Sequence, residues 1–102
     1  METEPSIPEL NRFFKAITND ERISMPHLCV YMALFQCWNK NGFHNPIMIR
    51  RSEVMQLAKI NAKTTYHKCI KDLQIGGYIS YSPSFNPKGE SNVIIHIPKK
   101  TV

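Results

Sequence analysis

The sequence lacks the features that mark secreted, membrane-spanning or metal-binding proteins. Its three cysteines are an odd, widely spaced set without a Cys-x-x-Cys pair. Such a set indicates neither a disulfide framework nor a zinc ribbon, and suits small buried thiols in a reducing compartment. No apolar run reaches the length of a membrane span, and the first ten residues are acidic and polar, unlike a signal peptide. These observations predict a cytoplasmic protein.

Sequence motifs that carry catalysis are also missing. There is no phosphate-cradling glycine loop, no Gly-x-Ser-x-Gly elbow and no carboxylate pair beyond the acidic N-terminal segment. His67 and Cys69, like His27 and Cys29, stand two positions apart, which on a helix points their side chains about 160° away from each other. Neither pair can share a metal or act as nucleophile and base. We expect no enzyme, no cofactor and no metal, with a zinc site built from scattered ligands left as an alternative.

Acidic residues are scarce outside the N-terminal segment. Residues 1–21 carry five acids against two bases, a net charge of −3, whereas residues 22–102 carry eleven Lys and Arg against three acids, a net charge of +8. The chain as a whole has a net charge of +5 over 102 residues, a length that fits one domain. A body this basic favours a polyanionic partner such as nucleic acid, and an ordinary soluble surface is the alternative.

The first 22 residues form an acidic segment with an amphipathic helix. Ser6 and Glu9 have the spacing of a capping box, with Pro8 in the first turn. The apolar residues that follow recur at helical spacing: Leu10, Phe13, Phe14 and Ile17. This stripe either packs on the rest of the chain or forms the interface of a homodimer.

The main domain is expected over residues 23–98, followed by a basic tail at 99–102. Ser24 caps a second helix, which is apolar nearly all round and stops at Asn41-Gly42. A short extended segment at 46–49 leads to a helix that Ser52 caps and that runs through Ile60. Asn61 then caps a further helix, and this short connection is typical of a helix-turn-helix corner.

The helix expected over 62–75 has two distinct faces. One face gathers apolar residues: Ala62, Tyr66, Cys69, Ile70 and Leu73. The opposite face gathers polar residues at i, i+3, i+4 and i+7: Thr64, His67, Lys68 and Lys71. Gly76-Gly77 gives the left-handed stop that ends a helix.

Two strands are expected at the C-terminal end, at 78–81 and 93–97, with a loop over 83–91. The predicted fold is therefore mainly α with a small β-hairpin. In this order the hairpin is the wing of a winged helix, a three-helix core whose third helix faces outward, and an extra helix precedes it.

The run SEVMQLAKINAKTTYHKCIKDLQIGGYI resembles the helix-turn-helix and wing start of winged-helix DNA-binding proteins. Joined to PHLCVYMALFQCWN, it is similar to small winged-helix proteins of Bacteroides-type mobile elements and to N-terminal modules of plasmid and phage replication proteins. The resemblance covers roughly residues 24–97. The usual corner glycine is absent, Tyr66 stands at or beside a position that usually holds a small aliphatic residue, and the recognition helix has no Arg.

The resemblance implies binding of duplex DNA, with helix 62–75 in the major groove, in transcription regulation or in excision and replication of a mobile element. The residues expected to contact DNA are Lys63, Thr64, His67, Lys68, Lys71, Arg50, Arg51 and, in the wing, Lys88. Two adjacent Arg at a helix N-terminus oppose the helix dipole, so either an external anion compensates them or they are simple surface charge. The rival interpretation is a winged-helix docking module that binds protein and not DNA.

Overall fold

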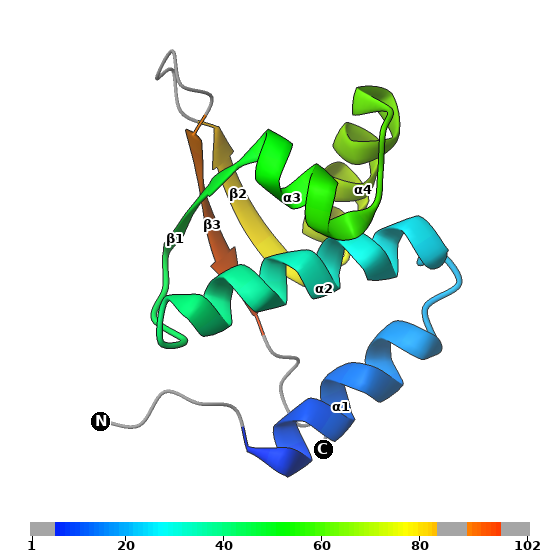
Figure 1. The fold of residues 1–102 in the computed structure, drawn as a ribbon. Coiled ribbons are helices and arrows are strands. Elements are labelled where there is room, and N and C mark those ends of the chain that lie inside the picture. Colours follow the sequence, from blue (N-terminus) through cyan, green and yellow to red (C-terminus); the bar gives the residue numbers. More distant parts are fainter. Residues whose placement is uncertain (1–5, 84–89, 97–102) are drawn as a thin grey trace.

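The structure is a computed structural model that describes residues 6–83 and 90–96, apart from the side chain of Leu10. In this part of the chain four helices accompany a three-stranded antiparallel sheet (Figure 1). The elements in chain order are α1 (Ile7–Thr18), α2 (Met25–Lys40), β1 (Ile47–Arg50), α3 (Arg51–Ala58), α4 (Lys63–Ile75), β2 (Ile79–Pro83) and β3 (Glu90–Ile95). The fold is thus mixed α/β, with the helices in the expected order.

The sheet is larger than the expected hairpin, because the short segment before α3 joins it as a full strand. The strand order is β1-β3-β2, with Ile47 opposite Val93 and Ile79 opposite Ile95. The Asn45 side chain also exchanges two hydrogen bonds with the backbone of Ile95, which extends the pairing beyond β1. The sequence indicated only a short extended segment here, because a run of four residues shows too little periodicity to identify the strand with which it pairs.

The caps of the first two helices are where the sequence places them. Ser6 Oγ accepts from the N–H of Glu9, and the Glu9 carboxylate accepts from the N–H of Ser6, which completes the capping box. Ser24 is the N-cap of α2, and its own N–H donates to Nδ1 of His27 at 3.0 Å. His27 therefore occupies the place that Glu or Gln takes in a capping box, and its ring is fixed at the start of α2.

The starts of α3 and α4 were each predicted wrongly. Arg50, not Ser52, is the N-cap of α3, because β1 runs directly into the helix without a loop. Ala62, not Asn61, is the N-cap of α4, and it is exposed rather than part of the apolar face. Local cap preferences were overridden here by the path of the chain between packed elements.

Three helices end with the hydrogen bonds of a Schellman motif around a residue with positive φ. Gly42 (φ +66°) and Gly77 (φ +83°) take this place after α2 and α4, as the sequence indicates. Lys59 (φ +62°) takes it after α3, which therefore ends at Ala58 and not at Ile60. The missing corner glycine is thus replaced by a lysine in a left-handed backbone conformation.

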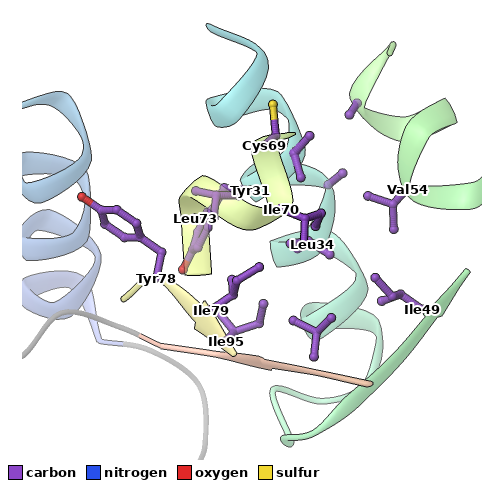
Figure 2. Close-up of a cluster of buried hydrophobic side chains, with 14 of the residues drawn as sticks. Tyr31, Leu34, Ile49, Val54, Cys69, Ile70, Leu73, Tyr78, Ile79 and Ile95 are labelled. Carbon is purple, nitrogen blue, oxygen red and sulfur yellow. The ribbon is translucent and has the colours of Figure 1, made fainter. Parts of the chain in front are cut away.

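The core lies between α2, α4 and the inner face of the sheet (Figure 2). Its fully buried members come from every layer: Tyr31, Leu34, Val54, Tyr66, Leu73, Ile79 and Val93. Along β3, Ser91, Val93 and Ile95 point inward and alternate with exposed positions. The inward positions of Val93 and Ile95 confirm the predicted alternation, but the strand begins at Glu90, within the expected loop, because it pairs there with β1.

Helix α1 packs on the rest of the chain, with α2 between it and the pair α3 and α4 (Figure 1). The ring of Phe13 stacks on Tyr31 with centroids 4.3 Å apart, and Ile17 is fully buried. These two members of the α1 stripe therefore belong to the chain's own core. Phe14 is 63% exposed, so it is the member of the stripe that remains accessible.

Candidate nucleic-acid interface

Helix α4 is held by one face and leaves the other accessible. Tyr66, Cys69, Ile70 and Leu73 are buried against α2 and the sheet. The opposite face holds the predicted contact residues, all exposed: Thr64, His67, Lys68 and Lys71. Lys63, the first residue of the helix, is exposed beside them. The two-sided character predicted from helical spacing is therefore confirmed.

The N-terminus of α4 is open. Its first hydrogen bond runs from the N–H of Tyr66 to the carbonyl of Ala62 at 3.1 Å, and no described side chain caps the preceding turn. The first-turn N–H groups of a helix have no partner within the helix, and they carry the positive end of its dipole. Lys63 and Thr64 stand in this turn, so backbone donors, an ammonium group and a hydroxyl share one end of α4.

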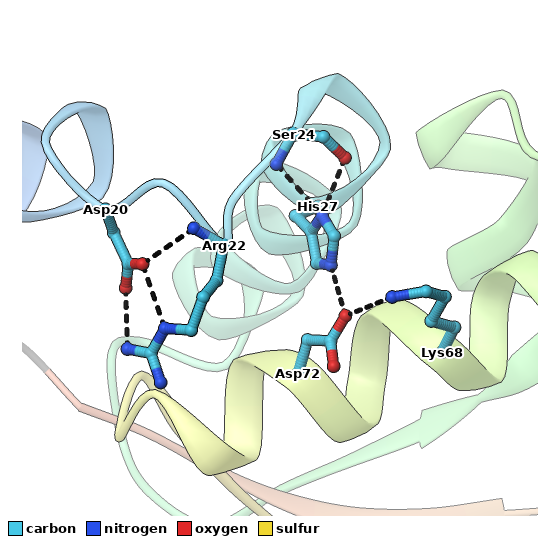
Figure 3. A network of polar contacts seen from close by, with 6 residues as sticks. All are labelled: Asp20, Arg22, Ser24, His27, Lys68 and Asp72. Atoms are coloured by element: carbon cyan, nitrogen blue, oxygen red, sulfur yellow. Dashed lines mark hydrogen bonds and ion pairs between the residues drawn. The ribbon is translucent and has the colours of Figure 1, made fainter.

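Lys68 differs from the other cations of α4 because it already has a partner. Its Nζ lies 2.9 Å from Oδ2 of Asp72, one helical turn further on. The same oxygen lies 2.8 Å from Nε2 of His27 (Figure 3). The hydrogen bonds from Lys68 and then His27 lower the pKa of Asp72 below its usual range, and the carboxylate raises the pKa of Lys68.

His27 anchors this arrangement to α2. Its side chain is only 7% exposed. Because the Ser24 N–H donates to Nδ1, that nitrogen presents a lone pair and the geometry assigns the ring proton to Nε2, which donates to Asp72. A buried ring at the start of α2 thus fixes one carboxylate oxygen on the flank of α4.

Lys63 and Lys71 form no ion pair with any residue of 6–83 or 90–96. Both are exposed, and neither lies within hydrogen-bond reach of a described carboxylate. They are therefore the cations of α4 that can approach a polyanion without breaking a contact.

The two Arg before α3 are placed differently from each other. Arg50 lies opposite Glu90 in the sheet, and its Nη2 lies 3.5 Å from the Glu90 carboxylate. The external anion inferred for this pair is thus not needed at Arg50, because β3 supplies the negative charge. Arg51 is exposed at the first position of α3 without an ion pair in the described ranges. Lys88, the cation predicted for the wing, lies outside the described residues.

Part of the exposed surface of α2 is apolar. Two shallow grooves meet at Met32, one beside Phe14 and Phe35 and the other beside Met25 and Leu57. Met25 is 72% and Met32 51% exposed. Single exposed apolar residues are ordinary on a protein surface, whereas these large side chains are neighbours along the two grooves.

No cluster of three or more His, Cys, Asp or Glu that could hold a metal ion occurs among the described residues. Within those residues, no helix has both the length and the apolar character needed to cross a membrane. All three cysteines are free thiols.

Comparison of the chain with protein-family models, with curated proteins and with solved structures finds no match.

Sequence reasoning missed the contact between His27 and Asp72. The Lys68–Asp72 half could have been recognised from its i, i+4 spacing on a predicted helix. The His27 half joins residues 45 positions apart, and nothing in the local pattern of either segment indicates it. The open start of α4 was missed because Asn61 is a good capping residue that stands one position too early.

Proposed function

We propose that this chain binds duplex DNA as a winged helix-turn-helix protein. In this proposal α4 enters the major groove, while the strands β2 and β3 belong to the wing. The single observation that carries the proposal is the exposed polar face of α4, with Lys63 and Thr64 at an open helix N-terminus and Lys71 further along the same face. A major groove accommodates a helix, and such groups suit its phosphates and base edges.

The charge distribution supports the same conclusion. The net charge of +8 over residues 22–102 would raise the local concentration of a polyanion around the body of the domain. The resemblance to winged-helix proteins of mobile elements and replication modules supports a role in transcription regulation, excision or replication.

The first test is direct binding. A fluorescently labelled duplex titrated with the protein at low salt should show a shift in anisotropy, and log K should fall linearly with log salt concentration at a slope of about 0.9 per neutralised phosphate. Lys71→Gln should weaken binding and reduce this slope. Lys40→Gln removes the same charge at the far end of α2, and should leave both unchanged (Figure 1). No shift with the unmodified protein at low salt would refute the proposal.

A second test separates loss of binding from loss of folding. Ala62→Asp and Ala62→Ser each supply the missing cap of α4, so both should stabilise the fold by about 0.5–2 kcal/mol. Only the Asp variant places a negative charge where a phosphate would lie. We expect a more stable protein that binds DNA more weakly, whereas the Ser variant should bind nearly as well as the unmodified chain.

Sequence preference is part of the proposal and has its own test. Thr64 and His67 are exposed polar groups on α4 that can distinguish base edges, and the helix has no Arg for this purpose. Repeated selection from a pool of random duplexes should enrich a short shared sequence. Substitution of both residues by Ala should abolish the enrichment while leaving the salt-dependent binding in place.

The apolar surface over α2 favours a second candidate, a docking module that binds protein instead of DNA. The same surface and the exposed Phe14 are where a homodimer would form, which would place two copies of α4 on two half-sites. Sedimentation over a range of protein concentrations tests the dimer. A monomer that binds duplex DNA would retain the main proposal without the dimer, and a dimer that binds none would favour docking.

A further inference from the structure

Asp72 lies on the flank of the DNA-facing helix, where a negative charge opposes binding of a polyanion. It accepts two hydrogen bonds on one oxygen, from Lys68 and from His27 (Figure 3). We propose that Asp72 is a positioning residue that holds Lys68 in an ion pair and so keeps it from contacting the phosphates. The electrostatic contacts of α4 with DNA then come from Lys63 and Lys71. This inference rests on the proposed DNA binding and specifies which of its cations are available.

The restraint depends on the fixed position of the carboxylate. His27 is nearly buried and its Nδ1 is occupied by the Ser24 N–H, so the ring cannot turn to follow Asp72. The side chain of Asp72 is 24% exposed and that of Lys68 is 72% exposed. His27 therefore fixes the Asp72 carboxylate, whereas the exposed Lys68 side chain can move. If Lys68 moved to a phosphate, the Asp72 carboxylate would lose its cation and remain as a negative charge beside the DNA, which opposes that movement.

Arg22, the cation nearest to this end of α4, does not neutralise the Asp72 carboxylate. Arg22 lies near the end of α4, where a Cβ at Gly76 would be 3.4 Å from its Nη2. Its guanidinium, however, makes two hydrogen bonds to Asp20, at 3.0 and 2.8 Å (Figure 3). Among the described groups, the lysine in contact with Asp72 is therefore Lys68, and His27 adds a hydrogen bond to the same oxygen.

The first test compares the two lysines in the otherwise unmodified protein. Duplex binding is measured by anisotropy at several salt concentrations for Lys68→Gln and Lys71→Gln. We expect Lys71→Gln to reduce the log–log salt slope by about 0.9, the value for one phosphate contact. Lys68→Gln should change the slope by close to zero, because Lys68 is bound to Asp72 and makes no phosphate contact that could be lost. Because this variant also leaves the Asp72 carboxylate without its cation, the comparison is made on the slope and not on the affinity. Equal losses of slope for the two variants would overturn the inference.

The second test releases the restraint. Asp72→Asn keeps an oxygen that can accept from His27 but removes the charge that holds Lys68. We expect an affinity about two- to fivefold higher at low salt and a slope steeper by about 0.9. In the double variant with Lys68→Gln this added slope should disappear. Glu53→Gln, which removes a carboxylate that faces Lys40, is the control for net charge and should leave the slope unchanged.

The outcomes distinguish this inference from the proposal beneath it. If the unmodified chain binds no duplex, the proposed function fails and the inference falls with it. If it binds, and Asp72→Asn steepens the slope equally with and without Lys68, the carboxylate acts only as a general negative charge and the inference alone is wrong. If Asp72→Asn does not fold, as thermal unfolding would reveal, the comparison of Lys68→Gln with Lys71→Gln decides the matter.

Discussion

The hydroxyl of Tyr78 donates to the carboxylate of Asp20 over 2.9 Å, which joins the residue before β2 to the turn after α1. The same carboxylate accepts three more hydrogen bonds, all from the backbone and guanidinium of Arg22. The Arg22 guanidinium and then these other donors hold the pKa of Asp20 far below its usual range. Burial, followed by the bond to Asp20, raises the pKa of Tyr78 to about 12.

This contact predicts how stability depends on pH. The pKa of Asp20 is lower in the folded chain than its ordinary value of about 3.9. At a pH between the folded and the unfolded pKa, the unfolded chain therefore binds more protons than the folded chain. The stabilisation is therefore present above about pH 4 and is lost as the pH falls toward the folded pKa. Urea unfolding should therefore show similar stability at pH 7 and pH 5 and lower stability at pH 3, with a smaller fall for Asp20→Asn.

Tyr78→Phe is the matched variant for this pH dependence. It removes the phenol donor but leaves the carboxylate and Arg22, so most of the acid sensitivity should persist at lower overall stability. The lowered pKa of Asp72 also makes the fold less stable in acid, and both variants retain this contribution. An Asp20→Asn protein that loses stability in acid as steeply as the unmodified chain would contradict the prediction.

Tyr66 carries a buried hydroxyl that has no hydrogen-bond partner among the described residues. A buried polar group without a partner costs about 1–3 kcal/mol. Tyr66→Phe removes the oxygen and keeps the ring, so its free energy of unfolding should equal or exceed that of the unmodified chain. Tyr31 is the control, because its hydroxyl donates to the carbonyl of His96 at 3.3 Å. Tyr31→Phe should cost about 0.5–1.5 kcal/mol in the same urea titration.

Lys59 ends α3 with a φ of +62°, a conformation that costs a side-chain-bearing residue about 1–2 kcal/mol relative to glycine. Lys59→Gly should therefore raise the free energy of unfolding by about 1 kcal/mol, a shift of about 4–8 °C in Tm for a domain of this size. Lys59→Ala removes the same charge without relieving the backbone, so it should give no comparable gain. Equal effects of the two substitutions would show that charge, not φ, decides stability here.

Much of the fold could be predicted because its signals are local. The capping box at Ser6, the stops at Gly42 and Gly77 and the two faces of α4 all depend on residues within a few positions of one another. The third strand could not be identified in the same way. Its partner lies more than 40 residues away in β3, and four residues are too few to specify a pairing.

The candidate site could be predicted in its composition but not in its electrostatics. Helical spacing was sufficient to place Lys68 and Lys71 together on the exposed face of α4. The same spacing would also pair Lys68 with Asp72, but it could not show that His27, on another helix, fixes this carboxylate in place. Arg50 is a similar case, since its partner Glu90 is set by strand register. Counts of positive charge therefore overstate the charge that is free to bind.

The neighbours Phe13 and Phe14 test which face of α1 holds the fold together. Phe13 is 5% exposed and stacks on Tyr31, whereas Phe14 is 63% exposed. Phe13→Ala should cost about 3–5 kcal/mol, most of the stability of a domain this small. Phe14→Ala should change the free energy of unfolding by less than about 0.5 kcal/mol. Thermal and urea unfolding of both variants at two protein concentrations give the comparison. A loss at Phe14 that depends on protein concentration would place this side chain in a homodimer interface, and a concentration-independent loss as large as that at Phe13 would contradict the packing of α1.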